Sequence, residues 1–320
     1  MLREYFDYRQ IRQSLNSTEI YAITMLLFCS VLDLIYFKQI EQSALLLIVN
    51  FGVFVYLSFS AIYFKNNPQS KLIFIYKSLF IGICYIFYQQ MQSYIRVSNP
   101  FLYDDLLIKV DYSIFGTNPT QALKEISNKY LTEYLQIAYA SFYITSLIIA
   151  IELYKSKKRS ELNEFVDLMS FGFYISYLAY FLFPAVGPRF TLHNFAMTNL
   201  ELPGLFLTDF LRDFVNTGGG IPHGVSNPEF YVNRDCFPSG HTMLTLMNII
   251  AAFKFKTKVR YFVLIIGSSL IFSTVYLRYH YVIDVVFGVI FCLFAYLIEQ
   301  RIRKYINNRI LFRNGKIINN

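Results

Sequence analysis

Two short windows of the sequence gather residue types that carry out proton transfer and nucleophilic attack in many enzymes. The first, Arg234–Thr242, reads Arg-Asp-Cys-Phe-Pro-Ser-Gly-His-Thr, and the second, Leu277–Asp284, reads Leu-Arg-Tyr-His-Tyr-Val-Ile-Asp. Each window places a histidine, His241 or His280, where an apolar run meets a polar loop. Because the chain holds only four histidines, this placement of two of them indicates one shared site.

The second window has the spacing of an oriented histidine. His280 and Asp284 are four residues apart, which puts both on one face of a helix, with the aspartate leaning back toward the imidazole. A carboxylate bonded to one ring nitrogen fixes the tautomer and raises the basicity of the other nitrogen. We therefore expect His280 to be a nucleophile and Asp284 to orient it.

The first window predicts a helix start that binds an anion. Ser239 and Gly240 would open the helix, where unpaired N–H groups and the dipole favour negative charge, and Gly240 would let a ligand approach the backbone. His241 would lie beside that anion, and Arg189 and Arg278 would add bidentate donors for phosphate oxygens. The set predicts phosphoryl transfer through a phosphohistidine, with His241 protonating the leaving oxygen. Neither a metal nor another cofactor is expected, because the positive charge is built in.

The composition predicts an all-α fold, namely a polytopic membrane helical bundle. Hydrophobic residues make up 55% of the chain and charged residues 16%, and the charges cluster between long apolar runs. The net charge of +8 indicates membrane orientation rather than nucleic-acid binding, because the basic residues lie in short loops. About eight runs are long enough, or nearly so, to cross a bilayer core, which needs about 20 residues: 20–37, 43–64, 72–90, 131–154, 165–184, 239–254, 260–278 and 281–299.

The loops between these runs alternate between rich and poor in Lys and Arg, as the positive-inside rule requires. The richer set includes both termini, which we expect to be cytoplasmic. The poorer set includes the long connection 185–238, which is expected to form an outer lid or substrate-facing loop. The outer ends of the fifth to eighth spans would then bring Arg189, His241 and His280 together on the extracytoplasmic face, either periplasmic or lumenal.

Several other polar residues are expected to be structural. Cys236 lies alone in the longest loop, so no disulfide is expected there. His193 and His223 are expected to be solvated, and Lys77 is expected to extend toward the cytoplasmic side. A helix that starts at Pro119 and keeps apolar spacing to residue 130 is expected to lie on the outer surface.

These residues resemble the type-2 phosphatidic acid phosphatase superfamily, which also contains the vanadium haloperoxidases. Residues 238–241, Pro-Ser-Gly-His, match its second motif in full, and His280 with Asp284 matches the His-x-x-x-Asp of its third. The resemblance implies that His280 is the nucleophile, that Asp284 orients it and that His241 is the acid. It also implies a six-helix core in residues 131–300, preceded by N-terminal transmembrane helices and an outer interfacial segment in 1–130 and followed by a basic cytoplasmic tail in 301–320.

The chain departs from that pattern at two places. Its first motif reads Pro-Arg-Phe at residues 188–190 without the usual upstream lysine, and Ser273 of the third motif is followed by threonine, so Arg278 is the nearest arginine. These departures are similar to a branch that contains inositol phosphorylceramide synthases, and both windows are also similar to the sphingomyelin synthases. Such enzymes transfer a phospho-head group from a glycerolipid to a ceramide.

The expected function is therefore an integral membrane lipid phosphatase or phosphotransferase that acts on a phospholipid or another lipid phosphoester. One version is a hydrolase that uses water, and the other is a head-group transferase that uses a lipid alcohol as acceptor. A third alternative is a transporter or scaffold that keeps the fold without turnover.

Overall fold

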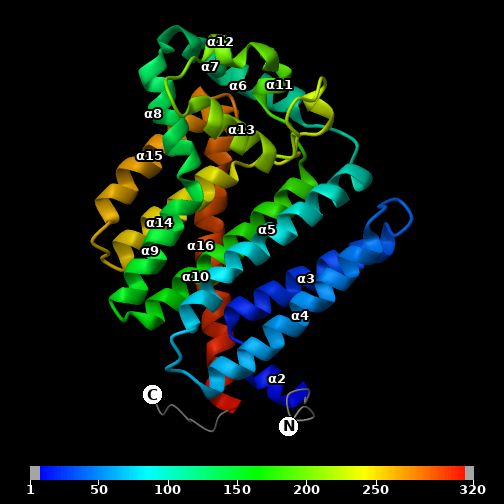
Figure 1. The fold of residues 1–320 in the computed structure, drawn as a ribbon, viewed down its shortest axis with the longest axis vertical. Helices are drawn as coiled ribbons and strands as arrows, with labels where there is room; N and C mark the ends of the chain where they lie inside the picture. Colours follow the sequence, from blue (N-terminus) through cyan, green and yellow to red (C-terminus); the bar gives the residue numbers. More distant parts are fainter. Residues whose placement is uncertain (1–7, 314–320) are drawn as a thin grey trace. The chain divides into compact units, whose positions relative to one another are not determined.

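The computed structural model describes residues 8–313, and every regular element in that range is a helix (Figure 1). The predicted all-α membrane bundle is therefore confirmed. Four helices contain a stretch long and apolar enough to cross a membrane, namely α3 (Ser17–Ile35), α4 (Ser43–Asn66), α10 (Arg159–Leu182) and α16 (Val282–Arg313). These four helices correspond to the first, second, fifth and eighth predicted spans.

The other predicted spans are also helical, but none of them is a single helix that meets the length and composition of a membrane span. The run at 131–154 forms two helices, α8 (Lys129–Ala140) and α9 (Phe142–Lys155), which are bent by 52° and can count as one broken span. The runs at 72–90, 239–254 and 260–278 form α5 (Ile73–Ser98), α14 (Gly240–Lys254) and α15 (Arg260–Tyr276). Because α14 and α15 have 15 and 17 residues, length and composition identify four or five spans where about eight were expected.

The chain divides into two compact units. The first comprises Met1–Ser98, Leu153–Ile175 and Phe294–Asn320, and the second comprises Asn99–Glu152 and Ser176–Leu293. In the first unit α3 packs against α4 and α5, and α2 (Tyr8–Ser14) packs against α4. Helix α16 continues to Arg313, so the predicted tail is helical in its first part, whereas residues 314–320 lie outside the described residues.

The second unit contains all the residues that the sequence assigns to chemistry. Within it α15 packs against both α14 and α8, and α13 packs against α8. Its shorter elements are α6 (Asp104–Phe115), α7 (Pro119–Ala122), η1 (Leu123–Ile126), α11 (Pro188–Thr191), η2 (Phe195–Met197), α12 (Thr198–Glu201), α13 (Thr208–Gly218) and η3 (Pro228–Phe230).

The helix expected from Pro119 to residue 130 is shorter than predicted. It begins at Pro119, but α7 and η1 end at Ile126. The side chain of Asn128 then accepts hydrogen bonds from the N–H groups of Tyr130 and Leu131. Asn128 therefore caps the next helix, and the apolar spacing that suggested one helix runs across two.

Candidate active site

The start of α14 is fixed by Ser239. Its Oγ accepts the N–H of Thr242 at 3.2 Å and the hydroxyl of Thr242 at 3.0 Å, while its own N–H donates to the carbonyl of Asp284 at 3.0 Å. Ser239 is thus the N-cap of α14, as predicted, and it also joins α14 to α16. His241 follows in the first turn.

Gly240 lies against a tyrosine, whereas we expected it to lie against a ligand. A Cβ atom at this position would lie 2.0 Å from the hydroxyl oxygen of Tyr180, so any side chain there would displace Tyr180. The space beside the Gly240 Cα is therefore occupied by a tyrosine rather than open to a ligand.

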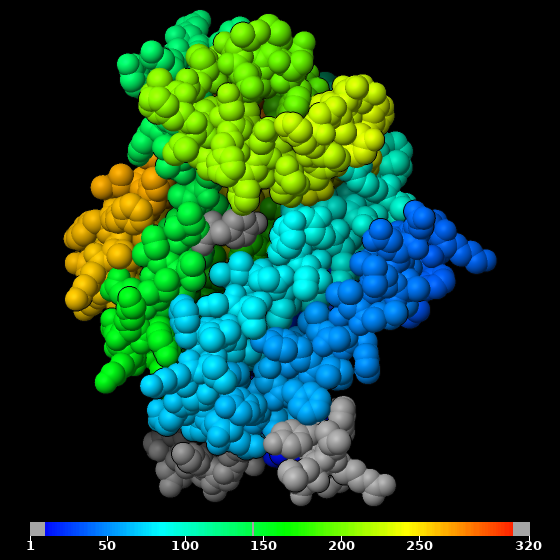
Figure 2. Space-filling model, viewed as in Figure 1, coloured from blue at the N-terminus to red at the C-terminus, as the bar shows by residue number. Residues whose placement is uncertain are grey.

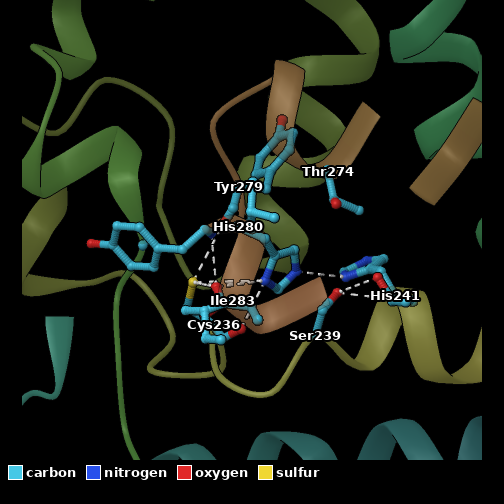
Figure 3. A network of polar contacts seen from close by, with 12 residues as sticks. Cys236, Ser239, His241, Thr274, Tyr279, His280 and Ile283 are labelled. Atoms are coloured by element: carbon cyan, nitrogen blue, oxygen red, sulfur yellow. Dashed lines mark hydrogen bonds and ion pairs between the residues drawn. The ribbon is translucent and has the colours of Figure 1, made fainter. Parts of the chain in front are cut away.

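The two histidines that define the windows lie side by side (Figure 3). Nε2 of His280 is 3.4 Å from Nδ1 of His241, and the ring centroids are 5.6 Å apart. Nδ1 of His280 lies 2.7 Å from the carbonyl oxygen of Cys236. Because a carbonyl can only accept, this contact favours the tautomer with its proton on Nδ1, in which Nε2 presents its lone pair toward His241.

Asp284 lies behind the His280 ring, as predicted. Its Oδ2 is 3.4 Å from Nδ1 of His280, and it accepts the N–H of Tyr281 and the thiol of Cys236, each at 2.9 Å. Helix α16 begins only at Val282, so the expectation that His280 shares a helix with Asp284 is wrong. His280 lies in the turn before the helix, where its N–H donates to the carbonyl of residue 274 at 2.9 Å.

Cys236 lies in the first window and is part of the site, although we expected no role for it there beyond the absence of a disulfide. It is 4% exposed, and its carbonyl and thiol contact His280 and Asp284, respectively. Burial and, after it, the negative charge of Asp284 raise the pKa of this thiol well above its usual value. The three side chains could hold a metal ion, because their ligand atoms all lie within 4.8 Å of one another. In this structure the Cys236 thiol donates a hydrogen bond to Asp284.

Two carboxylates on α6 hold the loops that carry the site. Asp111 accepts the N–H groups of Val282 and Ile283, each at 2.8 Å, and so caps α16. Asp104 accepts the N–H of Gly187 at 2.8 Å and the hydroxyl of Tyr281 at 2.9 Å. Asp104 and Asp111 are seven residues apart, or two helical turns, which places them on the same face of α6.

Arg278 is fully buried at 0% exposure and ends α15 in the left-handed conformation, with φ +67°. Its Nη1 donates to Oε2 of Glu201 at 2.5 Å. Within the described range of 8–313, its Nε and Nη2 have no hydrogen-bond partner. Hydrogen bonds from Lys124 and Arg278 lower the pKa of Glu201 to about 2, so the carboxylate that holds this guanidinium is ionised at any physiological pH.

Arg189 is joined to Arg278 through the backbone, but its side chain points into a cavity. Its N–H donates to the carbonyl of Arg278 at 3.1 Å, and its Nη1 donates to Asn216 at 2.7 Å. The guanidinium carbon lies 4.7 Å from the ring centroid of Tyr279. The cavity measures about 190 Å³ and is lined by Arg189, Asn216 and Tyr279 together with Phe195, Ala196, Thr198, Asn199, Asp209, Arg212, Asp213 and Leu277.

Stacked rings run from this cavity to the histidines. The Tyr279 ring stacks on Tyr139 at 4.3 Å, and the Tyr139 ring stacks on His241 at 4.7 Å. The structure therefore brings His241, His280, Asp284 and Ser239 together. It places the guanidinium of Arg189 at the far end of this row of rings.

The two loop histidines, His193 and His223, each have a partner of their own. His223 is exposed, as expected, and its Nδ1 lies 3.6 Å from Asp213. His193 is half-buried rather than solvated, and its Nε2 lies 3.0 Å from the hydroxyl of Thr120. Burial, reinforced by the charge of Arg278, lowers the pKa of His193 to about 4.

The comparisons with known proteins agree with this geometry. A family model described as the PAP2 superfamily matches residues 107–298, which is more than half of the chain and includes both histidine windows. The comparison with curated proteins and the comparison with solved structures each give no match. The matched family supports a phosphatase-type activity on a lipid phosphoester in a membrane context. The chain belongs to the PAP2 superfamily, that of the type-2 phosphatidic acid phosphatases.

Proposed function

We propose that the protein cleaves or transfers a lipid phosphoester through a phosphohistidine formed at Nε2 of His280. The observation that carries this proposal is the distance of 2.7 Å between Nδ1 and the Cys236 carbonyl. A carbonyl only accepts, so this contact favours the tautomer with its proton on Nδ1 and an unshared pair on Nε2 beside His241. An imidazole with a fixed tautomer and a carboxylate behind it is an activated nucleophile.

The reaction has two balanced steps. Nε2 of His280 attacks phosphorus, the bond from phosphorus to the leaving oxygen breaks, and His241 gives that oxygen a proton. An acceptor hydroxyl then attacks the phosphohistidine, His241 takes the proton of the acceptor, and the bond from phosphorus to Nε2 breaks. Both steps return the enzyme to its starting protonation state, and neither uses a metal or another cofactor.

We assign the phosphate oxygens to groups around the start of α14. The hydroxyl of Ser239 already accepts two hydrogen bonds, which leaves its own hydrogen for an anion. The N–H groups of Gly240 and His241 lie at the positive end of the helix. Arg278 supplies the two nitrogens that have no protein partner in the described chain, and Arg189 binds an anionic part of the lipid from the cavity side.

A transferase is the second candidate, and the burial of the site favours it. His280 is 3% exposed and Asp284 0% exposed, which limits the access of water to a phosphohistidine and so favours a lipid alcohol as acceptor. The first and third motifs also favour a transferase, because they resemble those of inositol phosphorylceramide and sphingomyelin synthases.

The test is to trap the intermediate on purified protein in lipid nanodiscs with a phosphate-labelled phospholipid. An acid-labile, base-stable label on the protein supports the proposal, and the His280→Ala variant must lose it. The His223→Ala variant is the matched control, because His223 is exposed and away from the site. Labelled protein from His280→Ala would refute the nucleophile assignment, and an inert but folded wild type would favour a transporter or scaffold.

The same preparation separates the hydrolase from the transferase. Labelled lipid is supplied alone, with diacylglycerol, with ceramide or with an inositol lipid. Free phosphate in the absence of an acceptor identifies a hydrolase, whereas label that appears only on an added lipid alcohol identifies a transferase.

We also propose that the site faces the extracytoplasmic side and that both termini are cytoplasmic. All four native cysteines are buried, so single added cysteines report on sidedness. An impermeant maleimide should label the Asp213→Cys variant in intact cells, and it should label the Lys157→Cys variant only after lysis. The opposite pattern would reverse the orientation.

A further inference from the structure

Helix α13 has two faces of opposite character. Thr208 and Arg212 are buried at 2% and 7% exposure, and Val215 packs against the buried cluster that contains Leu135 and Tyr139. The polar side chains Asp209, Arg212, Asp213 and Asn216 line the cavity that also holds Arg189. One side of the helix therefore belongs to the protein interior and to the cavity.

The other side of α13 is apolar and uncovered. Phe206 is 88% exposed, Phe210 68%, Phe214 60% and Leu207 48%. Phe210 and Phe214 are four residues apart in α13 and so share one face of the helix, while Phe206 and Leu207 lie in the turn directly before it. Figure 2 shows the segment that carries them, in yellow-green, at the surface of the molecule. We call these four residues the phenylalanine face.

This face is held rigidly by α8. The carboxylate of Glu133 accepts the N–H groups of residues 205–208, at distances from 2.7 to 3.3 Å, and the hydroxyl of Thr208 at 2.6 Å. Four of these bonds come from backbone N–H groups, and those of Leu207 and Thr208 are among the free N–H groups at the start of α13. Because Glu133 is only 8% exposed, the start of α13 is bound to the body of the second unit rather than to solvent.

We infer that the phenylalanine face lies in the outer lipid leaflet and that α13 is an interfacial helix. A helix with an aromatic face opposite charged residues is the form that lies in the plane of a membrane surface. The connection that contains α13 joins α10, a candidate membrane span, to α14, so the helix belongs to a chain that is already held at a bilayer. The phenylalanine face itself carries no charged residue, as burial among acyl chains requires.

One consequence deepens the proposed function and depends on it. The same helix has lipid on one side and the Arg189 cavity on the other, and Tyr279 of that cavity precedes His280 directly in the chain. A phospholipid in the leaflet can therefore move its head group around α13 into the cavity while its acyl chains stay beside the phenylalanine face.

The absence of tryptophan from the chain gives a direct test. The Phe210→Trp and Phe214→Trp variants each carry a single tryptophan, and the Asp209→Trp variant is a matched control on the polar side of the same helix. Each protein is reconstituted as one copy per nanodisc, with lipids brominated near the head of the acyl chain. We expect blue-shifted emission and at least twofold stronger bromine quenching for the two phenylalanine positions, and stronger iodide quenching for the control.

Other outcomes contradict the inference. Equal iodide quenching at positions 209, 210 and 214 would mean that the face lies in water. Emission that is shielded from both iodide and bromine, and only in discs that hold two copies, would mean that the face binds a second protein chain.

An activity assay tests the consequence separately. The Phe210→Glu/Phe214→Glu double variant should lose activity on vesicle lipid about tenfold and keep its activity on a short-chain, monomeric lipid, whereas the Phe210→Leu/Phe214→Leu control should keep both. Equal losses on the two substrates would refute the delivery role. A wild-type protein without activity would refute the proposed function and leave the fluorescence result intact.

Discussion

Two buried carboxylates of the first unit, Glu19 and Glu299, are each paired with a cation. Glu19, at 0% exposure, accepts the hydroxyl of Tyr76 at 2.6 Å, and Nζ of the buried Lys77 lies 3.6 Å from the same carboxylate. Arg303 donates to Glu299 at 2.9 Å. In such pairs each ion compensates the desolvation of the other, and their role is to fix how the helices pack.

The second unit leaves a buried charge partly open. Arg278 is as buried as Glu19, yet only one of its nitrogens is bonded, to Glu201, and the other two have no partner in the described chain. It also adopts a left-handed backbone conformation, with φ +67°, which costs a non-glycine residue about 1–2 kcal/mol. A residue that carries both costs is better explained by a ligand than by packing.

The catalytic pair gives the largest expected effect. The His280→Ala variant should lose about 10⁴-fold in kcat while its melting temperature stays within a few degrees of wild type. Steady-state assays beside thermal unfolding in detergent measure both. If activity falls only because less protein is folded, the role of His280 is structural, like that of the ion pairs in the first unit.

The closed pair of the first unit should respond in the opposite way. The Lys77→Met variant leaves Glu19 buried without its cation and should destabilise the protein by about 3–5 kcal/mol, with unchanged activity per folded molecule. Adding Glu19→Gln should restore most of that stability. Denaturant unfolding of both variants measures the effect, and a stable single variant would show that the pair is dispensable.

Removal of the open charge should lower the activity of each folded molecule. The Arg278→Gly variant suits the left-handed conformation but loses the guanidinium, so we expect about a 10²-fold fall in kcat/KM per folded molecule, in addition to the loss of stability from the cavity that it leaves. Phosphate protection against thermal unfolding should weaken in parallel. Full activity of this variant would mean that Arg278 serves packing alone.

Substitutions of Cys236 test whether its hydrogen bond to Asp284 contributes to catalysis. The Cys236→Ala variant removes the thiol donor to Asp284 and should lower kcat about tenfold, whereas Cys236→Ser keeps a donor and should lose less. Comparison of the kcat and KM values of the two variants measures the effect. A rise in KM alone would assign Cys236 to substrate binding instead.

His193 gives the smallest effect, and it concerns stability. Its pKa of about 4 in the folded protein lies below the 6.5 of an ordinary histidine, so between these values the unfolded chain binds more protons. The free energy of unfolding should therefore fall as the pH drops from 6.5 to 4. Below pH 4 the titration of His193 should cause no further change. Melting temperatures of wild type and His193→Gln across this range test it, because the variant should have the flatter profile.

The sequence was sufficient to locate the long apolar helices and the two histidine windows, but not α6 or α13. The apolar runs located the helices, because long apolar segments must form helices in a membrane. The proline and glycine beside His241 marked the start of α14. The windows were joined by the rule for loop charge alone, without any contact information.

The sequence was not sufficient where a residue acts through a distant partner. Nothing in the spacing of Cys236 shows that its carbonyl holds His280. Nor does the sequence show that Lys77 is buried against Glu19, which lies 58 residues away. The sequence also does not show that Tyr180 occupies the space beside Gly240. Such contacts depend on tertiary packing rather than on any local period.

Asp104 limits where the chain can be truncated to obtain an isolated domain. The family match begins at residue 107, three residues after this aspartate, yet Asp104 ties the segment at Val186 and Gly187 to the hydroxyl of Tyr281. An excised domain cut at the family boundary would release the loop before Arg189 from the turn that presents His280. A transplantable catalytic module must therefore begin upstream of α6.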